Sequence, residues 1–471
     1  MSSSRAVPLL ALAAGLAVIA GGGCSVKNPD FCCSTVESCS QAGAGAIVAC
    51  ANPAEPYCDD QGAYGPARAC IADPQTTACH GPDDCPTPAL PVCDADDTGT
   101  CVGCASDDDC TRFAGTQRCD VTGSHACVVC VSDDDCGSAT PVCGADHTCR
   151  ACGADGECAS GVCAQGGTCP AAADVIYVDA AAAASNTDCT QAAPCHTIAL
   201  GVAKIDATRR TMRIAPAAAP YAERVVLDGK TVDLVATGAE LTSTIDPVLD
   251  VVGGSVVTIR GLDVNRGMGR GVHCNGASVT LREAEVEMSV GRGIDATDCT
   301  LTVERSRILD NNGGGIAVSS GRTTIRNTFI GKNGNVAFSV GGVYVMDPFD
   351  LTFEFNTVVD NFVSNAGAAG LNCSTGSAVT VTNNIIVGGN PNQVDATTCA
   401  PTYTLSNELV TGTGNLMGSP TFRNAGARDY HLLAGSMGID QADPAATLDT
   451  DIDGESRPAG AHADLGADEL H

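Results

Sequence analysis

Six segments of the chain repeat one pattern: VTIRGLDV at 257–264, VTLREAEV at 279–286, LTVERSRI at 301–308, TTIRNTFI at 323–330, LTFEFNTV at 351–358 and VTVTNNII at 379–386. Successive segments start 22, 22, 22, 28 and 28 residues apart. Each carries a Thr between two mostly apolar positions and an aliphatic residue five positions further on. This alternation is typical of strands with one buried face. The fixed period predicts that each repeat forms one coil, stacked in parallel about 4.8 Å from its neighbour.

A further strand in each coil is indicated by a glycine followed by an aliphatic residue, at Gly271-Val272, Gly293-Ile294, Gly315-Ile316, Gly342-Val343 and Gly370-Leu371. Asn311, Asn333 and Asn361 recur in register and are candidates for an asparagine ladder. A β-sandwich is the alternative for many short strands, but it has no reason to keep constant spacings. The pattern resembles the right-handed parallel β-helix of the pectin-lyase-like superfamily, which implies an all-β solenoid.

Cysteines dominate the region before the repeats, and 16 of the 29 lie between residues 79 and 169. They form four units of four: Cys79, Cys85, Cys93, Cys101; Cys104, Cys110, Cys119, Cys127; Cys130, Cys136, Cys143, Cys149; Cys152, Cys158, Cys163, Cys169. Units this short cannot build a core, so small disulfide-rich repeats are expected, with three pairings open in each. Zinc is the alternative, since Cys127-x2-Cys130 and Cys149-x2-Cys152 have ribbon-like spacing. The region resembles the cysteine-rich repeats of bacterial surface lipoproteins, which implies a spacer or binding module.

The N-terminus reads as an export signal, with Arg5 followed by an uncharged apolar run from residue 6 to 20. The run ends in three glycines and Cys24, which resembles the lipobox of bacterial lipoproteins, although Gly21 stands where Leu is usual. This resemblance implies lipidation of Cys24 and an outer-membrane or cell-surface location. Ordinary cleavage near this point, giving a secreted chain, is the alternative.

Six cysteines lie beyond residue 175, and their spacing suggests three pairs. Cys274 and Cys299, like Cys373 and Cys399, are about one coil apart, within reach of disulfides between neighbouring coils. Cys189 and Cys195 are expected to close a loop. The expected divisions are 1–24 signal peptide, 25–170 cysteine-rich repeats, 171–224 N-terminal cap with a helix within 197–207, 225–400 β-helix coils, and 401–471 a closing segment that resembles that of choice-of-anchor β-helix lipoproteins.

Charge and composition argue against several classes of partner and binding site. The formal net charge of −30 argues against nucleic acid as a partner and against anionic membranes, apart from a lipid anchor. The chain has no Trp and only 3% aromatic residues, which argues against an aromatic-lined sugar cleft. We expect a monomer whose partner is a polysaccharide or a surface protein.

Candidate catalytic and metal-binding residues are few. Asp310 and Asp360 occupy equivalent positions two coils apart, with Lys332 between them, and are candidates for the paired carboxylates of a glycosidase. Asp at a turn is more often structural. Asp449, Asp451 and Asp453 begin a D-x-D-x-D-G pattern typical of Ca²⁺ loops, but Gly460 stands where Glu should close it.

Two functional hypotheses follow. The first is a non-catalytic surface lipoprotein that presents its β-helix for adhesion or glycan contact, with no cofactor unless Ca²⁺ binds. The second is a polysaccharide lyase or glycoside hydrolase on the same scaffold. Outward Arg260, Arg282 and Arg326 share one position with Glu304 and Glu354, which predicts a ladder of paired charges and favours the first hypothesis.

Overall fold

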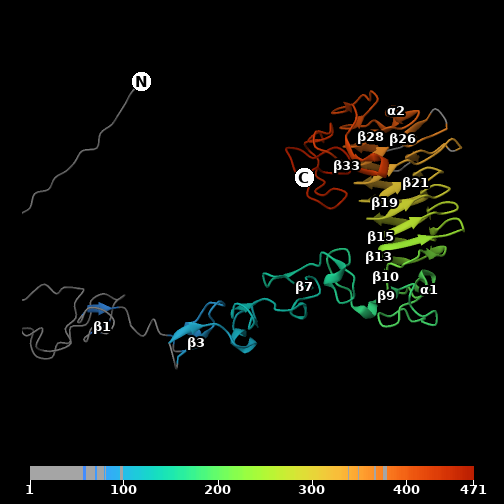
Figure 1. The fold of residues 1–471 in the computed structure, drawn as a ribbon. Helices are drawn as coiled ribbons and strands as arrows, with labels where there is room; N and C mark the ends of the chain where they lie inside the picture. The colour runs from blue at the N-terminus through green and yellow to red at the C-terminus, as the bar shows by residue number, and fades with distance from the viewer. Residues whose placement is uncertain are drawn as a thin grey trace, which may run out of the picture. The chain divides into compact units, whose positions relative to one another are not determined.

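The computed structural model describes strands β1 (Tyr57–Asp59) and β2 (Ala69–Ile71), residue 79, and residues 81–95, 99–337, 339–347, 350–364, 367–374 and 379–471. These residues form two compact units, each described by itself below (Figure 1). One unit runs to Gly137 and includes Val142–Arg150; the other holds Ser138–Pro141 and everything from Ala151 onward. The expected signal peptide, Cys24 and most of the chain before Cys79 lie outside the described residues.

The first unit is a series of two-stranded antiparallel hairpins, most of them preceded by a 3-10 helix. Its elements are β1 and β2; η1 (Pro82–Asp84), β3 (Val92–Asp94) and β4 (Thr100–Val102); η2 (Asp107–Cys110), β5 (Arg118–Cys119) and β6 (Cys127–Val128); η3 (Asp133–Asp135), β7 (Val142–Cys143) and β8 (Cys149–Arg150). Within each hairpin from β3 to β8, the third and fourth cysteines of a unit face each other across the strands.

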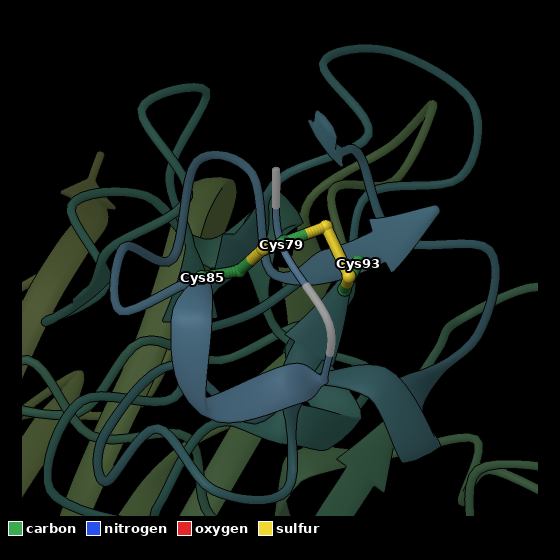
Figure 2. Close-up of side chains that lie close together, drawn as sticks. All are labelled: Cys79, Cys85 and Cys93. Carbon is green, nitrogen blue, oxygen red and sulfur yellow. A yellow bond between two sulfur atoms is a disulfide. The ribbon is translucent and has the colours of Figure 1, made fainter. Parts of the chain in front are cut away.

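All four cysteine units share one disulfide pairing: the first cysteine bonds the third, and the second bonds the fourth. The bonds are Cys79–Cys93, Cys85–Cys101, Cys104–Cys119, Cys110–Cys127, Cys130–Cys143, Cys136–Cys149, Cys152–Cys163 and Cys158–Cys169. Figure 2 shows Cys79 bonded to Cys93, with Cys85 beside them. Because every sulfur of the two C-x2-C pairs considered for zinc is in a disulfide, the zinc alternative is wrong for these pairs.

The acidic runs of this region hold the backbone in place. Asp107 accepts a hydrogen bond from the N–H of Cys119 (2.8 Å), and this bond, with that from Arg118, lowers the pKa of Asp107. Asp109 accepts from the N–H of Ala105 (2.8 Å). The same two contacts recur as Asp133 with Cys143, Asp135 with Val131, Asp155 with Cys163 and Glu157 with Gly153. These carboxylates therefore hold each turn against its hairpin through hydrogen bonds to the backbone.

The second unit is a parallel β-helix of about eight coils, in which each strand pairs with the strand one coil further along (Figure 1). Its strands are β9 (Val175–Val178), β10 (Thr211–Ile214), β11 (Tyr221–Ala222), β12 (Val225–Asp228), β13 (Thr231–Thr242), β14 (Leu249–Val252), β15 (Val256–Asn265), β16 (Val272–Asn275), β17 (Ser278–Arg282), β18 (Glu285–Glu287), β19 (Ile294–Glu304), β20 (Arg307–Leu309), β21 (Ile316–Arg326), β22 (Phe329–Gly331), β23 (Val343–Met346), β24 (Asp350–Glu354), β25 (Thr357–Val359), β26 (Ala368–Cys373), β27 (Val379–Thr382), β28 (Ile385–Val387), β29 (Asn392–Val394), β30 (Leu405–Ser406) and β31 (Leu416–Met417).

The register predicted from the repeats is confirmed. Ile259 pairs with Leu281, and Leu281 pairs with Val303, and all three are fully buried in a continuous core. The six repeat segments pair in order from β15 to β27, as do the aliphatic positions from Val264 to Ile386. The asparagine ladder also forms: Asn311 Nδ2 donates to Asn333 Oδ1, and Asn333 Nδ2 donates to Asn361 Oδ1, both at 3.0 Å.

Two corners of the coils use left-handed backbone at residues other than glycine, each over five successive coils. One corner stacks Glu283, Arg305, Asn327, Phe355 and Asn383 with φ between 45° and 59°, and the other stacks Arg266, Met288, Asp310, Lys332 and Asp360 with φ of 52–55°. This conformation is uncommon for such side chains. It turns the chain sharply and leaves these side chains on the outside of the coils.

Both ends of the second unit carry additional structure. The fourth cysteine unit, with η4 (Asp155–Glu157), precedes η5 (Ala172–Asp174) and packs on the first coils, where Val162 contacts a cluster containing Tyr177 and Val235. The expected N-terminal helix is α1 (Ile198–Val202), shorter than the 197–207 segment, and α2 (Ala396–Cys399) lies near the last coils.

The C-terminal segment folds back along the side of the coils. Strands β32 (Phe422–Asn424) and β33 (Asp429–Leu432), joined through η6 (Ala425–Ala427), form a hairpin. A second apolar cluster buries Phe329 and Phe355, which face outward from the coils, against Tyr430 and Leu465. The segment expected to close the last coil therefore also covers the outer face of several earlier coils.

Candidate functional site

A column of paired charges runs up one outward face of the coils. Arg282 and Arg326 lie on either side of Glu304 on successive coils, and Nε of each arginine is 2.9 Å and 2.7 Å, respectively, from a Glu304 oxygen. Arg326 Nη1 also lies 3.9 Å from Glu354. At the other end of the column, Arg260 donates to the Asp155 carboxylate at 2.6 Å. The predicted charge ladder is present on this face.

Arg305 lies at the centre of a groove beside this column. Its left-handed corner places it next to Glu283, to which Nη2 donates a hydrogen bond. Three adjoining hollows of about 290, 290 and 270 Å³ are each lined in part by Arg305. Charged residues of both signs line the groove: five arginines, Arg260, Arg282, Arg305, Arg307 and Arg326, and six carboxylates, Asp233, Glu283, Glu285, Glu304, Asp449 and Asp453.

The fourth cysteine unit and the C-terminal segment form the two walls of the groove. Residues 162–166 line the first hollow, where Arg260 also donates to the carbonyl of Cys163 at 3.0 Å. Residues 448–450 and 452–453 line the other two. A larger hollow, of about 480 Å³, lies in the cysteine-rich unit and is lined by one arginine, Arg118, which pairs with Asp107 and Asp135, both at 2.7 Å.

The candidate catalytic carboxylates Asp310 and Asp360 lie at a different corner, beside the C-terminal segment. Arg428 Nη1 is 2.8 Å from Asp310, and the intervening Lys332 donates to the carbonyl of Gly426 at 3.2 Å. Burial, followed by the charges of Asp360 and Asp310, raises the pKa of the Tyr430 hydroxyl. Segment 426–430 therefore packs against the corner that carries Asp310 and Lys332, while Asp360 is exposed.

A stack of three carboxylates is a feature that the sequence reasoning missed. Glu240, Asp263 and Glu285 pair in register on successive coils, and Arg307 continues the column. Burial, followed by the charge of Glu285, raises the pKa of Asp263 to about 7. Burial also raises the pKa of Glu285. The sequence does contain a pattern that indicates this stack: an acidic residue immediately precedes the final aliphatic position in two successive repeats.

The three calcium candidates do not form one ligand set. Asp451 is fully buried, and its two oxygens accept backbone N–H groups, from Glu455 at 2.8 Å and from Glu469 at 3.2 Å. Asp453 instead contacts His431 at 2.8 Å. Asp449 is exposed. The carboxylates of this turn thus organise the backbone, and they do not meet as a Ca²⁺ loop requires.

The six cysteines beyond residue 175 form three disulfides, Cys189–Cys195, Cys274–Cys299 and Cys373–Cys399. The second joins β16 to β19 on adjacent coils, with Cα atoms 6.2 Å apart. Within the residues that the structure describes, no helix is long and apolar enough to cross a bilayer.

The fold and its cysteine bonding define an all-β protein in which small disulfide-rich repeats precede a parallel β-helix. The family model described as "Right handed beta helix region" matches residues 249–410. Among solved structures, the crystal structure of pectate lyase Pel9A is similar, with 13% sequence identity, a TM-score of 0.41, and coverage of 63% of this chain and 96% of that chain. No curated protein matches the sequence.

Proposed function

We propose that this chain is an exported, non-catalytic surface lipoprotein, anchored through Cys24, whose arginine-lined groove binds a polysaccharide. The observation that carries the proposal is one groove lined by five arginines and six carboxylates, a dense set of hydrogen-bond donors and acceptors. Export and anchoring rest on the sequence of residues 1–24. The ligand class rests on the groove.

The groove offers hydrogen-bond donors from four successive coils, which stack about 4.8 Å apart. Arg260, Arg282 and Arg326 share one outward position on three of these coils, and Arg305 and Arg307 lie on the coil that carries Glu304. A guanidinium has five N–H donors, and each Glu contact uses only one or two. The remaining donors suit hydroxyl and carboxylate oxygens on a linear chain of sugars. A polysaccharide that presents hydroxyl groups to these donors and acceptors is therefore the favoured ligand, and a surface protein is the alternative partner.

Arg305→Glu tests the groove directly. The substitution removes the central cation with its N–H donors and places a second carboxylate beside Glu283, so affinity for the glycan should fall at least tenfold, about 1.4 kcal/mol. A glycan array with the purified protein, followed by titration calorimetry on its best ligand, measures this. Arg322→Glu, at an exposed arginine that lines none of the three hollows, is the matched control. Equal binding by both variants and the unmodified protein would contradict the proposal.

Glycoside hydrolysis is a second candidate function, favoured by the carboxylate stack. A carboxyl with a pKa near 7 can act as a general acid at neutral pH, and a neighbouring carboxylate on the next coil supplies a partner. Asp263 and Glu285 meet this description. A reducing-sugar screen against polysaccharides tests it: cleavage that is lost in Asp263→Asn or in Asp310→Asn would replace the binding proposal with an enzyme.

A further inference from the structure

His431 on β33 is held between carboxylates on both sides of its ring. Nδ1 contacts Asp429, and Nε2 lies 2.8 Å from Asp453 Oδ2. The residue is only 7% exposed. Its ring also packs edge-on against Phe329, with the centroids 5.2 Å apart. The imidazole therefore has one fixed orientation in the C-terminal segment.

This arrangement cannot be satisfied by a neutral imidazole alone. A neutral ring carries one N–H, so only one of the two carboxylates can accept a hydrogen bond from it. The other nitrogen then directs a lone pair at a carboxylate, which is repulsive. A proton or a metal ion must occupy the space between Nε2 and Asp453 if Nδ1–H is donated to Asp429.

A third ligand atom completes a set of donors around this space. A ligand atom on each of His431, Asp453 and Asp468 lies within 4.8 Å of the other two. Asp468 is 5% exposed, and one of its oxygens accepts the N–H of Leu432 at 2.6 Å, which fixes the carboxylate and leaves its second oxygen outside that bond. We infer that His431 Nε2, Asp453 and Asp468 form a binding site for a divalent transition-metal ion, best matched by Zn²⁺.

The donor set discriminates among metal ions. Zinc accepts imidazole nitrogen and carboxylate oxygen at about 2.0–2.2 Å, so ligand atoms around a tetrahedral ion stand about 3.4 Å apart. Small side-chain movements bring the three donors to that spacing. Calcium and magnesium prefer oxygen ligands in larger number, and a buried imidazole disfavours both. Asp429 acts as a positioning residue, because its hydrogen bond to Nδ1–H leaves Nε2 free to bind the metal.

The site is open to solvent on one side only. The side chain of Asp453 is 49% exposed and lines one of the groove hollows, which gives an ion a route in and leaves room for a water ligand. The three ligands come from β33, from the turn after Ile452 and from the final residues of the chain. Binding would therefore link three separate parts of the C-terminal segment.

Titration calorimetry with Zn²⁺ on the full-length chain tests the site. The protein carries Cys24→Ser, so that this thiol cannot compete for zinc, and is first treated with chelator. We expect one zinc per chain, and a rise in melting temperature when zinc is added. Asp453→Asn should weaken zinc binding at least tenfold without unfolding the protein, because this side chain is half exposed. Asp429→Asn should weaken it 10–100-fold through loss of orientation.

Asp449→Asn is the matched control, since Asp449 belongs to the same turn but not to the proposed ligand set. It should bind zinc like the parent chain. No zinc binding, or binding that survives Asp453→Asn, would overturn the site. Preferential binding of Ca²⁺ that is lost in Asp449→Asn would instead support the calcium loop and overturn the zinc site.

Discussion

Asp263 illustrates how a single outward position acquires unusual chemistry in a stacked fold. On an isolated strand its carboxylate would be solvated, but coil stacking places Glu240 on one side and Glu285 on the other. Its Oδ1 is buried without a hydrogen-bond partner. Burial and like charges both favour the protonated form. The position therefore costs stability once the carboxyl ionises.

The raised pKa of Asp263 has a predictable effect on stability. Because the folded pKa of about 7 exceeds the unfolded value of 3.8, the folded state holds a proton that the unfolded state has lost between these pH values. This group's contribution to stability is therefore fully present below about pH 4 and declines until about pH 7. Asp263→Asn should remove this decline and raise the melting temperature at pH 8. Melting curves from pH 4 to 8, with exposed Asp233→Asn as control, measure the difference.

At the scale of elements, the asparagine ladder connects coils where the strands end. Asn333 is fully buried, donates to the carbonyl of Ile308 (2.8 Å) and to Asn361, and accepts from the backbone N–H of Asn311 (3.0 Å). Each coil thus satisfies polar groups of its neighbours. A ladder of this kind fixes the spacing of the coils as well as their register.

Replacing one rung of the ladder should be costly. Asn333→Leu removes the side-chain bonds to the Ile308 carbonyl, the Asn311 backbone N–H and the amides of Asn311 and Asn361, so we expect a loss of about 2–4 kcal/mol in the free energy of unfolding. Denaturant unfolding followed by circular dichroism measures it. Asn312→Leu, at the exposed neighbouring position, should change it by less than about 0.5 kcal/mol. Equal effects of the two substitutions would show that the ladder adds no stability.

Much of the solenoid could be predicted from the sequence, because coil stacking repeats one short-range pattern. Ile259, Leu281 and Val303 show the core column at a constant spacing, and Asn333 shows the ladder. The left-handed corner at Arg305 could not be predicted, since nothing about an arginine signals positive φ. The groove was missed for the same reason.

The other features that could not be predicted from the sequence depend on contacts between segments that are distant along the chain. Disulfide pairing within a unit depends on which hairpin forms, and cysteine spacing does not reveal this. The folding back of the C-terminal segment depends on the outward faces of Phe329 and Phe355. The sequence pattern that indicated this covering segment was the presence of aromatic residues at positions expected to face solvent. His431 and Asp468 are 37 residues apart, so no local pattern joined them.

At the scale of the whole molecule, the proposed lipid anchor determines where the protein acts. Cys24→Ser should move the protein from the membrane fraction to the soluble fraction and abolish metabolic labelling with palmitate, because this thiol is the proposed acylation site. Cell fractionation with immunoblotting measures the shift. Ser25→Ala, at the adjacent residue, should leave both unchanged. If the unmodified protein is secreted and carries no label, ordinary signal cleavage is the correct reading.

The uniform disulfide pairing of the cysteine units has a mechanical consequence. In each unit the bond from the first to the third cysteine overlaps the bond from the second to the fourth, so neither loop can be pulled out while the other holds. When a tethered chain is drawn by flow or by a captured ligand, tension passes through sulfur–sulfur links and bypasses most of the enclosed backbone. The repeats should therefore lengthen very little under load. Reduction of both disulfides of a unit should release the backbone that they enclose in one step.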